Sequence, residues 1–112
     1  MELQMTDLGN ASRIALQGRL DTPGVDQIET RFTASVVSPG KNVLVDLSGV
    51  TFVSSMGIRM LIGTARSLNR KQARMILFGP QALVRESLDH VSINDVIPLV
   101  GTEAQALELL GA

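Results

Sequence analysis

The chain has 112 residues, of which 45% are hydrophobic and 19% charged, and its formal net charge is -1, from 10 basic and 11 acidic side chains. These values indicate a single globular domain over residues 1–112 and argue against direct nucleic-acid binding. Cysteine is absent, which excludes disulfide scaffolds, thiol catalysis and cysteine-based metal sites. The start lacks a basic region followed by an apolar run, and no segment reaches membrane-spanning length, so we expect a cytoplasmic protein without direct membrane insertion.

Strand signals followed by a helix signal open the chain. Two strand-like segments, residues 3–6 and 13–17, predict an opening hairpin. Thr22 followed by Pro23 predicts a helix with the threonine as its cap, and Pro39-Gly40 ends that helix. One face of the helix is apolar and consists of Val25, Ile28, Phe32 and Val36.

The rest of the chain continues the alternation. Residues 43–47 form a nearly continuous apolar run, which is typical of a strand covered on both faces, and a short loop follows it. A helix is then predicted from about Ser55 to Asn69. The later elements are a strand at residues 75–78, a helix around residues 83–88, a strand at residues 96–99 and a last helix behind a capping box of Thr102 and Gln105.

This order of elements predicts an α/β fold, with a small mixed, mostly parallel sheet packed with about four helices. If the crossovers are right-handed, the ends of the parallel strands share one edge of the sheet. That edge should gather Asp21, residues 48–55 and Gly79-Pro80. Ligand and partner sites in open α/β sheets favour such an edge.

The chemistry available at this edge is narrow. The only histidine, His90, lies in a different segment without triad spacing, so no catalytic residue is predicted. His90 is interpreted as a surface or boundary residue rather than a ligand. No Gly-Lys-Ser or Gly-Lys-Thr phosphate loop occurs, and the aspartates lack metal-loop spacing. We therefore expect neither a metal nor a cofactor.

Two motifs carry a family resemblance. They are LQGRLD at residues 16–21 and DLSGVTFVSSMG at residues 46–57. In these motifs, and in the order of elements over essentially the whole chain, the sequence resembles the STAS domain family, especially the bacterial anti-sigma-factor antagonists. The resemblance implies a non-enzymatic switch that binds a serine-kinase anti-sigma factor. In this family the kinase phosphorylates one serine of the antagonist, which weakens the complex, and a PP2C-type phosphatase restores it.

The resemblance also implies site residues. Against the family's Asp-Ser-Ser-Gly signature, Ser54 falls on the aspartate, Ser55 on the phosphorylated serine, Met56 on the next serine and Gly57 on the glycine. Asp21 matches the family's aspartate after the second strand. Ser55 is therefore the predicted acceptor, with Ser54 as the alternative. Arg19 stands where the family often has glutamate.

Helix spacing adds Met60 and Arg59 to the partner-binding residues. The predicted core stripe of this helix consists of Ile58, Leu61, Ile62, Ala65 and Leu68. Met56 and Met60 lie roughly opposite it, and they are interpreted either as an adaptable docking surface beside Ser55 or as side chains packed under a neighbouring element. Arg59 follows Ser55 by four residues, a spacing that permits contact with a phosphate on a helix; the alternative is a solvated arginine.

Asp21 and Gly57 each have two interpretations. Asp21 either orients the acceptor loop or serves only the start of the helix that follows it. Gly57 either permits close packing at the helix start, which is the expected role, or binds a ligand. The predicted partner-binding set is thus Asp21, Ser54, Ser55, Met56, Gly57, Arg59 and Met60.

Two other functions are compatible with the sequence. STAS-like domains also occur in transporters, so one alternative is an unphosphorylated accessory subunit of a lipid or solute ABC transporter. The other is a small-ligand sensor that uses the crevice at the strand ends.

Overall fold

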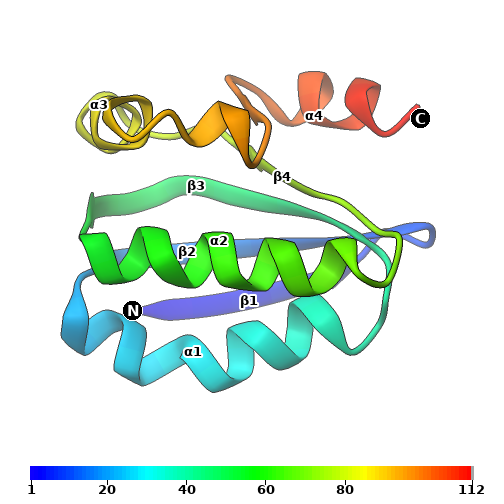
Figure 1. Ribbon diagram of the computed structural model, residues 1–112, viewed down its shortest axis with the longest axis horizontal. Helices are drawn as coiled ribbons and strands as arrows, with labels where there is room; N and C mark the ends of the chain where they lie inside the picture. Colours follow the sequence, from blue (N-terminus) through cyan, green and yellow to red (C-terminus); the bar gives the residue numbers. More distant parts are fainter. Residues whose placement is uncertain (112) are drawn as a thin grey trace.

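The computed structural model describes residues 1–111 and contains one five-stranded sheet with the strand order β1-β2-β3-β4-β5. The hairpin of β1 (Glu2–Asp7) and β2 (Ala11–Leu20) is antiparallel, as predicted. The remaining neighbours pair in parallel (Figure 1); they are β3 (Asn42–Val53), β4 (Met75–Phe78) and β5 (Leu99–Val100). The predicted mixed, mostly parallel sheet is confirmed.

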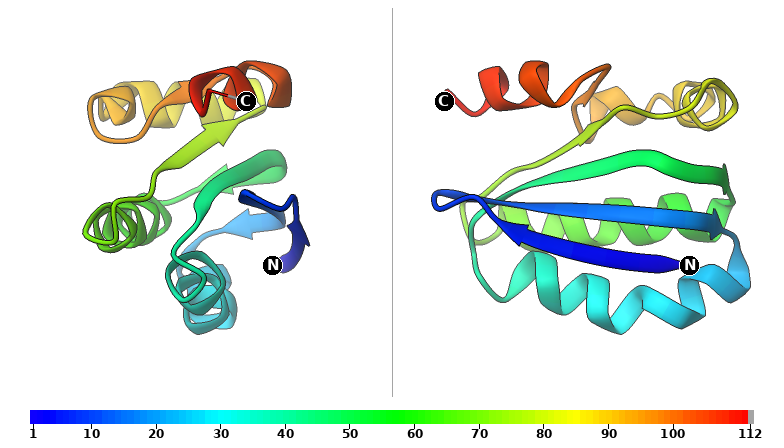
Figure 2. Two further views of the ribbon diagram at one scale, coloured as in Figure 1. Left: turned by 90° about the vertical axis from the view of Figure 1, so that its right-hand side faces the viewer. Right: turned by 180° about the vertical axis from the view of Figure 1, so that it is seen from behind.

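Helices cover the sheet on both faces. Figures 1 and 2 show α1 (Thr22–Val37) and α2 (Ser55–Asn69) on one face, with α3 (Ala82–His90) and α4 (Glu103–Leu109) on the other. A 3-10 turn, Ile93–Asp95, follows α3. In the right-hand view of Figure 2, β1 and β2 lie in front of α2. Within residues 1–111, no helix has the length and apolarity needed to cross a membrane.

The core explains the apolar run in the centre of the sequence. Val43, Val45 and Leu47 of β3 are buried in the main cluster, which also holds the apolar faces of α1 and α2. Leu44 belongs to a second cluster with Ile76, Phe78 and Ala106 on the side of α4. Because β3 has buried side chains on both faces, its sequence is nearly continuous in apolar residues rather than alternating.

The strand β3 is much longer than the predicted residues 43–47. It runs to Val53, because β2 pairs with it along its whole length, whereas β4 ends opposite Asp46. The pairing with β2 shifts register beyond Ala15, where Gln17 comes to lie opposite Gly49. Residues that were predicted to be a loop therefore satisfy their backbone hydrogen bonds within the sheet.

Two other predictions about local structure are wrong. The N-cap of α1 is Asp21 rather than Thr22, since the Asp21 carboxylate accepts a hydrogen bond from the Gly24 backbone at 2.9 Å. The strand predicted at residues 96–99 is the short β5, which starts at Leu99. The side chain of Asn94 accepts the Leu99 backbone N–H at 2.9 Å, so a turn held by side chains precedes the strand.

Candidate functional site

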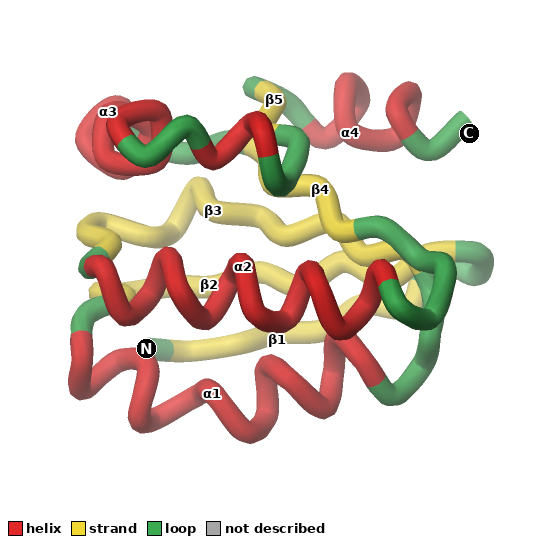
Figure 3. The backbone as a smooth tube through the Cα atoms, viewed as in Figure 1, coloured by secondary structure: helices red, strands yellow, loops and turns green. Residues whose placement is uncertain are grey.

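The candidate site lies where β2 and β3 end side by side (Figure 3). Leu20 pairs with Val53 in the sheet, and the Ser54 backbone N–H donates to the Leu20 carbonyl at 2.9 Å. The starts of α1 and α2 are therefore adjacent, which brings Asp21 and Ser54 to the same edge, as predicted. Gly79-Pro80 does not join them as predicted, because Gly79 lies beside Asp46 and Ser48 rather than beside Ser54.

The two serines at the start of α2 differ in their surroundings. Ser54 is the N-cap; its hydroxyl donates to the Leu20 carbonyl at 3.1 Å and accepts from the Gly57 backbone N–H at 3.2 Å. Ser55 is the first residue of the helix, and its side chain is exposed. Among residues 1–111, no hydrogen bond engages the Ser55 hydroxyl. The structure thus separates a capping serine from a free one.

Gly57 fits closely against the end of β2. A Cβ atom at this position would lie 2.7 Å from both the Leu20 carbonyl oxygen and the Leu20 Cγ. The expected role in close packing is confirmed. Gly57 is buried, so it allows the start of α2 to pack against β2 and offers no surface to a partner.

Asp21 lies at the junction of β2 and α1, within a small charged cluster. Its carboxylate caps α1 and pairs with the Arg19 Nε at 3.1 Å, while the Arg19 guanidinium lies 4.5 Å from the centre of the Phe52 ring. The backbone hydrogen bond from Gly24, and to a smaller extent the Arg19 interaction, lower the pKa of Asp21 below its ordinary value; partial desolvation opposes them. The role at the helix start is therefore shown, while an effect on the acceptor serine stays a prediction.

The two methionines of α2 lie in different environments. Met60 is 5% exposed and belongs to the main core, so the interpretation that it lies outside the core is wrong. Met56 is 39% exposed. Helix α1 packs against α2 on the flank where Met60 lies, which is the packing under a neighbouring element that the sequence left as an alternative.

Arg59 is exposed one turn after Ser55. Its Nη1 lies 3.9 Å from the Met56 sulfur, and none of the ion pairs within residues 1–111 includes it. The side chain is free to meet a phosphate on Ser55, so this role stays a prediction.

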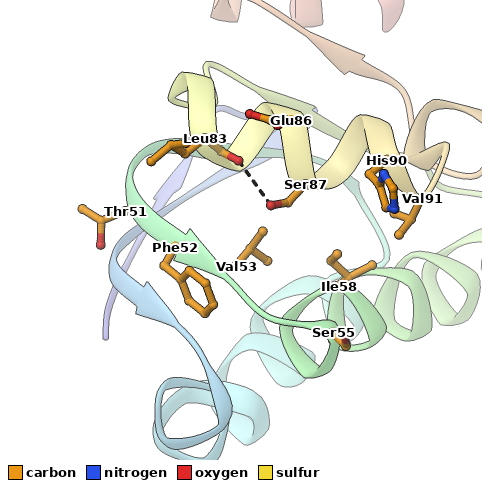
Figure 4. Close-up of a pocket in the computed structure, with 10 residues that line it drawn as sticks. All are labelled: Thr51, Phe52, Val53, Ser55, Ile58, Leu83, Glu86, Ser87, His90 and Val91. Atoms are coloured by element: carbon orange, nitrogen blue, oxygen red, sulfur yellow. Dashed lines mark hydrogen bonds between the residues drawn. The ribbon is translucent and has the colours of Figure 1, made fainter.

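A hollow of about 560 Å³ opens beside Ser55, between the end of β3, the start of α2 and helix α3 (Figure 4). Its lining residues are Thr51, Phe52, Val53, Ser55, Ile58, Leu83, Glu86, Ser87, His90 and Val91. Sequence reasoning missed the contribution of α3, because residues so far apart in the chain give no local signal.

The hollow brings His90 to the same cavity as Ser55. Within residues 1–111, neither side chain takes part in a hydrogen bond, so nothing there activates Ser55 as a nucleophile or orients His90 as a base. The same residues hold no cluster of three histidine or acidic side chains suited to a metal ion.

The family follows from a comparison over nearly the whole length. The family model of the STAS domain matches residues 2–106. The chain belongs to the STAS domain family. An anti-sigma F factor antagonist of Lysinibacillus sphaericus is 27% identical to this STAS chain over 96 residues, which cover 85% of this chain and 81% of the relative.

Solved structures share the STAS fold. An anti-sigma factor antagonist from Mycobacterium paratuberculosis superposes with a TM-score of 0.88 at 20% identity, covering 99% of this chain and 94% of that one. SpoIIAA, an anti-sigma factor antagonist solved in its unphosphorylated form, has a TM-score of 0.79 at 22% identity, with 97% and 96% covered. The phosphorylated form of SpoIIAA from Bacillus gives 0.71 at 21% identity, with 97% and 99% covered.

Proposed function

We propose that this STAS chain is an anti-sigma-factor antagonist and that phosphorylation of Ser55 switches its binding to an anti-sigma factor. The observation that carries the proposal is the contrast between the serines: Ser55 is exposed with a free hydroxyl, whereas the Ser54 hydroxyl holds two hydrogen bonds. The names of the relatives support the role of anti-sigma-factor antagonist. The unphosphorylated and phosphorylated forms of SpoIIAA support this kind of modification in the family.

A phosphate on Ser55 is compatible with the fold. It would add a charge of about -1.5 to -2 at pH 7 and three acceptor oxygens. Ser55 is the first residue of α2. Free backbone N–H groups and the helix dipole at such a position favour an anion by about 0.3 to 1 kcal/mol. The modified domain therefore stays folded, and the added charge acts on the partner; a loss of about 2.8 kcal/mol in binding weakens the complex about a hundredfold.

Two enzymes add and remove the phosphate on Ser55. The anti-sigma factor is a serine kinase that phosphorylates Ser55, and a PP2C-type phosphatase removes the phosphate. The STAS chain itself supplies the acceptor and the binding surface rather than a catalytic group, and it acts in the cytoplasm. We assign Asp21, Met56 and Arg59, whose side chains are at least partly exposed, to the accessible part of that surface.

The experiment is intact-mass measurement and peptide mapping of the chain isolated from its native cell, with and without phosphatase treatment. We expect one phosphoryl group on Ser55 that phosphatase removes. In vitro, Ser55→Ala should abolish modification by the kinase, and Ser54→Ala should retain it. An unmodified chain across growth and stress conditions would contradict the switch, and co-purification with a membrane ATPase would then favour a transporter subunit.

A second candidate function, a ligand sensor, is favoured by the hollow beside Ser55. Its volume of about 560 Å³ falls in the range of about 300 to 1,000 Å³ that is usual for small-molecule sites. Apolar side chains of Phe52, Leu83 and Val91 line it. A thermal-shift screen of metabolites tests this function; a stabilising ligand whose effect is lost in Leu83→Arg would support it.

A further inference from the structure

The charges of the chain are unevenly distributed along the sequence. Between Asp46 and Glu86 no acidic residue occurs, although the whole chain carries 11 acidic and 10 basic side chains. The basic residues in this interval are Arg59, Arg66, Arg70, Lys71, Arg74 and Arg85. Helix α2 and the turn after it are therefore strongly basic in a protein whose net charge is -1.

Within residues 1–111, three of these basic residues neither form an ion pair nor bind the end of another helix. Lys71 donates to the Val37 carbonyl at 2.9 Å and Arg74 to the Leu109 carbonyl at 2.9 Å, so both satisfy the ends of other helices. Arg59, Arg66 and Arg70 are exposed and take part in none of the ion pairs formed within residues 1–111. We refer to these three arginines as the basic stripe.

The basic stripe is aligned with Ser55. At about 100° per residue, Ser55, Arg59, Arg66 and Arg70 fall within a sector of about 60° around the α2 axis, over a length of about 22 Å. Ser55 lies at the start of this row and Arg70 at its end, as the C-cap. A phosphate on Ser55 would therefore stand at one end of the row of arginines.

A hollow of about 180 Å³ lies between α1 and α2, and Arg59 is the member of the basic stripe that lines it. Gly63 lines it and is exposed, and a Cβ atom there would meet no other atom within 4 Å. Glycine is the poorest helix former after proline, and nothing inside the chain requires it at this position. Its presence keeps the groove open to a side chain from outside. Glu29 of α1 is the one acidic residue that lines this hollow.

We propose that the basic stripe is the docking surface for an acidic segment of the partner protein. The partner is the anti-sigma factor of the proposed function, on which this inference rests. Charge complementarity identifies the partner's chemistry. A protein fits better than a membrane, because the apolar face of α2, with Leu61, Ala65 and Leu68, is already buried in the core. Phosphorylation of Ser55 then releases the partner by repelling its acidic segment and by competing for Arg59.

The test compares two charge reversals that change the net charge equally. Arg66→Glu lies in the basic stripe, and Arg85→Glu lies on α3, on the opposite face of the sheet. Binding to the anti-sigma factor that phosphorylates Ser55 is measured by surface plasmon resonance over a range of salt concentrations. We expect Arg66→Glu to raise Kd about tenfold at low salt and much less at high salt, with Arg85→Glu within about twofold of wild type. Equal melting temperatures show that both variants fold.

The outcomes separate this inference from the proposed function. If the kinase phosphorylates Ser55 but binds Arg66→Glu with unchanged Kd and salt dependence, the docking surface is wrong and the switch stands. If no kinase modifies Ser55, the switch fails, and amide NMR with a hexaglutamate peptide tests the basic stripe directly. Shifts confined to α2 and lost in Arg66→Glu support the surface. Absence of shifts, or shifts only with phosphatidylglycerol vesicles, would overturn it.

Discussion

Asp21 and Ser54 occupy equivalent positions at the ends of two neighbouring parallel strands. Each is the N-cap of the helix that follows, and each side chain accepts a hydrogen bond from the backbone N–H of a glycine three residues later, at 2.9 Å for Gly24 and 3.2 Å for Gly57. Neither glycine has room for a Cβ atom. This repeated arrangement starts α1 and α2 side by side and leaves Ser55 facing solvent.

The two serines at the start of α2 should respond differently to alanine. Ser54→Ala removes the cap and should lower the free energy of unfolding by about 1 kcal/mol. Ser55→Ala removes an exposed hydroxyl and should change it by less than about 0.5 kcal/mol. Urea denaturation measures both. Equal losses in the two variants would show that Ser55 has a structural role that its surroundings do not reveal.

The glycines of α2 form a second matched pair. In Gly57→Ala the new Cβ would lie 2.7 Å from the Leu20 carbonyl oxygen, so we expect a loss of about 1 to 3 kcal/mol in the free energy of unfolding. Gly63→Ala adds a methyl group in open space within a helix and should stabilise by about 0.5 to 1 kcal/mol. Denaturation curves of the two variants should shift in opposite directions, and a parallel shift would contradict the close contact at Gly57.

Local sequence signals predicted the elements that depend on local chemistry. The span Ser55–Asn69 of α2, the strand Met75–Phe78 and the capping box of Thr102 and Gln105 agree with the structure. The second half of β3 could not be predicted, because Ser48 and Thr51 have the polarity of a loop. These residues lie in a strand only because β2 continues beside them.

The candidate site shows the same division between local and tertiary information. The motif located Ser55 and the junction of strand and helix. The hollow formed with α3, and the burial of Met60 beneath α1, depend on how distant segments pack, and no spacing within one helix reveals this.

Met60 provides a test of that packing. Since it is 5% exposed within the core, Met60→Ala should cost about 2 to 3 kcal/mol in the free energy of unfolding. Met56→Ala, at a position 39% exposed, should cost less than about 0.5 kcal/mol. Met60→Asp should unfold the domain rather than weaken only partner binding. Thermal unfolding of the three variants decides this, and an unchanged melting temperature in Met60→Asp would place Met60 at the surface.

The Asp21 carboxylate should contribute to the pH dependence of stability. Its pKa is lowered from an ordinary value of 3.8, mainly by the Gly24 backbone hydrogen bond. The unfolded chain therefore binds the proton more tightly, and the contribution of Asp21 is complete above pH 3.8 and lost as the pH falls through the lower folded-state pKa. Asp21→Asn should flatten the fall in melting temperature below pH 4 relative to wild type. Asp7, whose pKa is also lowered, serves as the comparison through Asp7→Asn, which should leave the contribution of Asp21 intact.

Arg59 should neutralise part of the charge on phosphorylated Ser55. The two residues lie four apart on α2, and Arg59 is exposed without an ionic partner within residues 1–111. A nearby guanidinium favours the dianionic phosphate and lowers its second pKa. In phosphorus NMR titrations of the phosphoprotein, Arg59→Ala should raise that pKa by about 0.1 to 0.7 pH units, whereas Arg85→Ala on α3 should leave it unchanged. Identical titration curves for wild type and Arg59→Ala would mean that Arg59 stays solvated after modification. The helix N-terminus alone would then hold the phosphate.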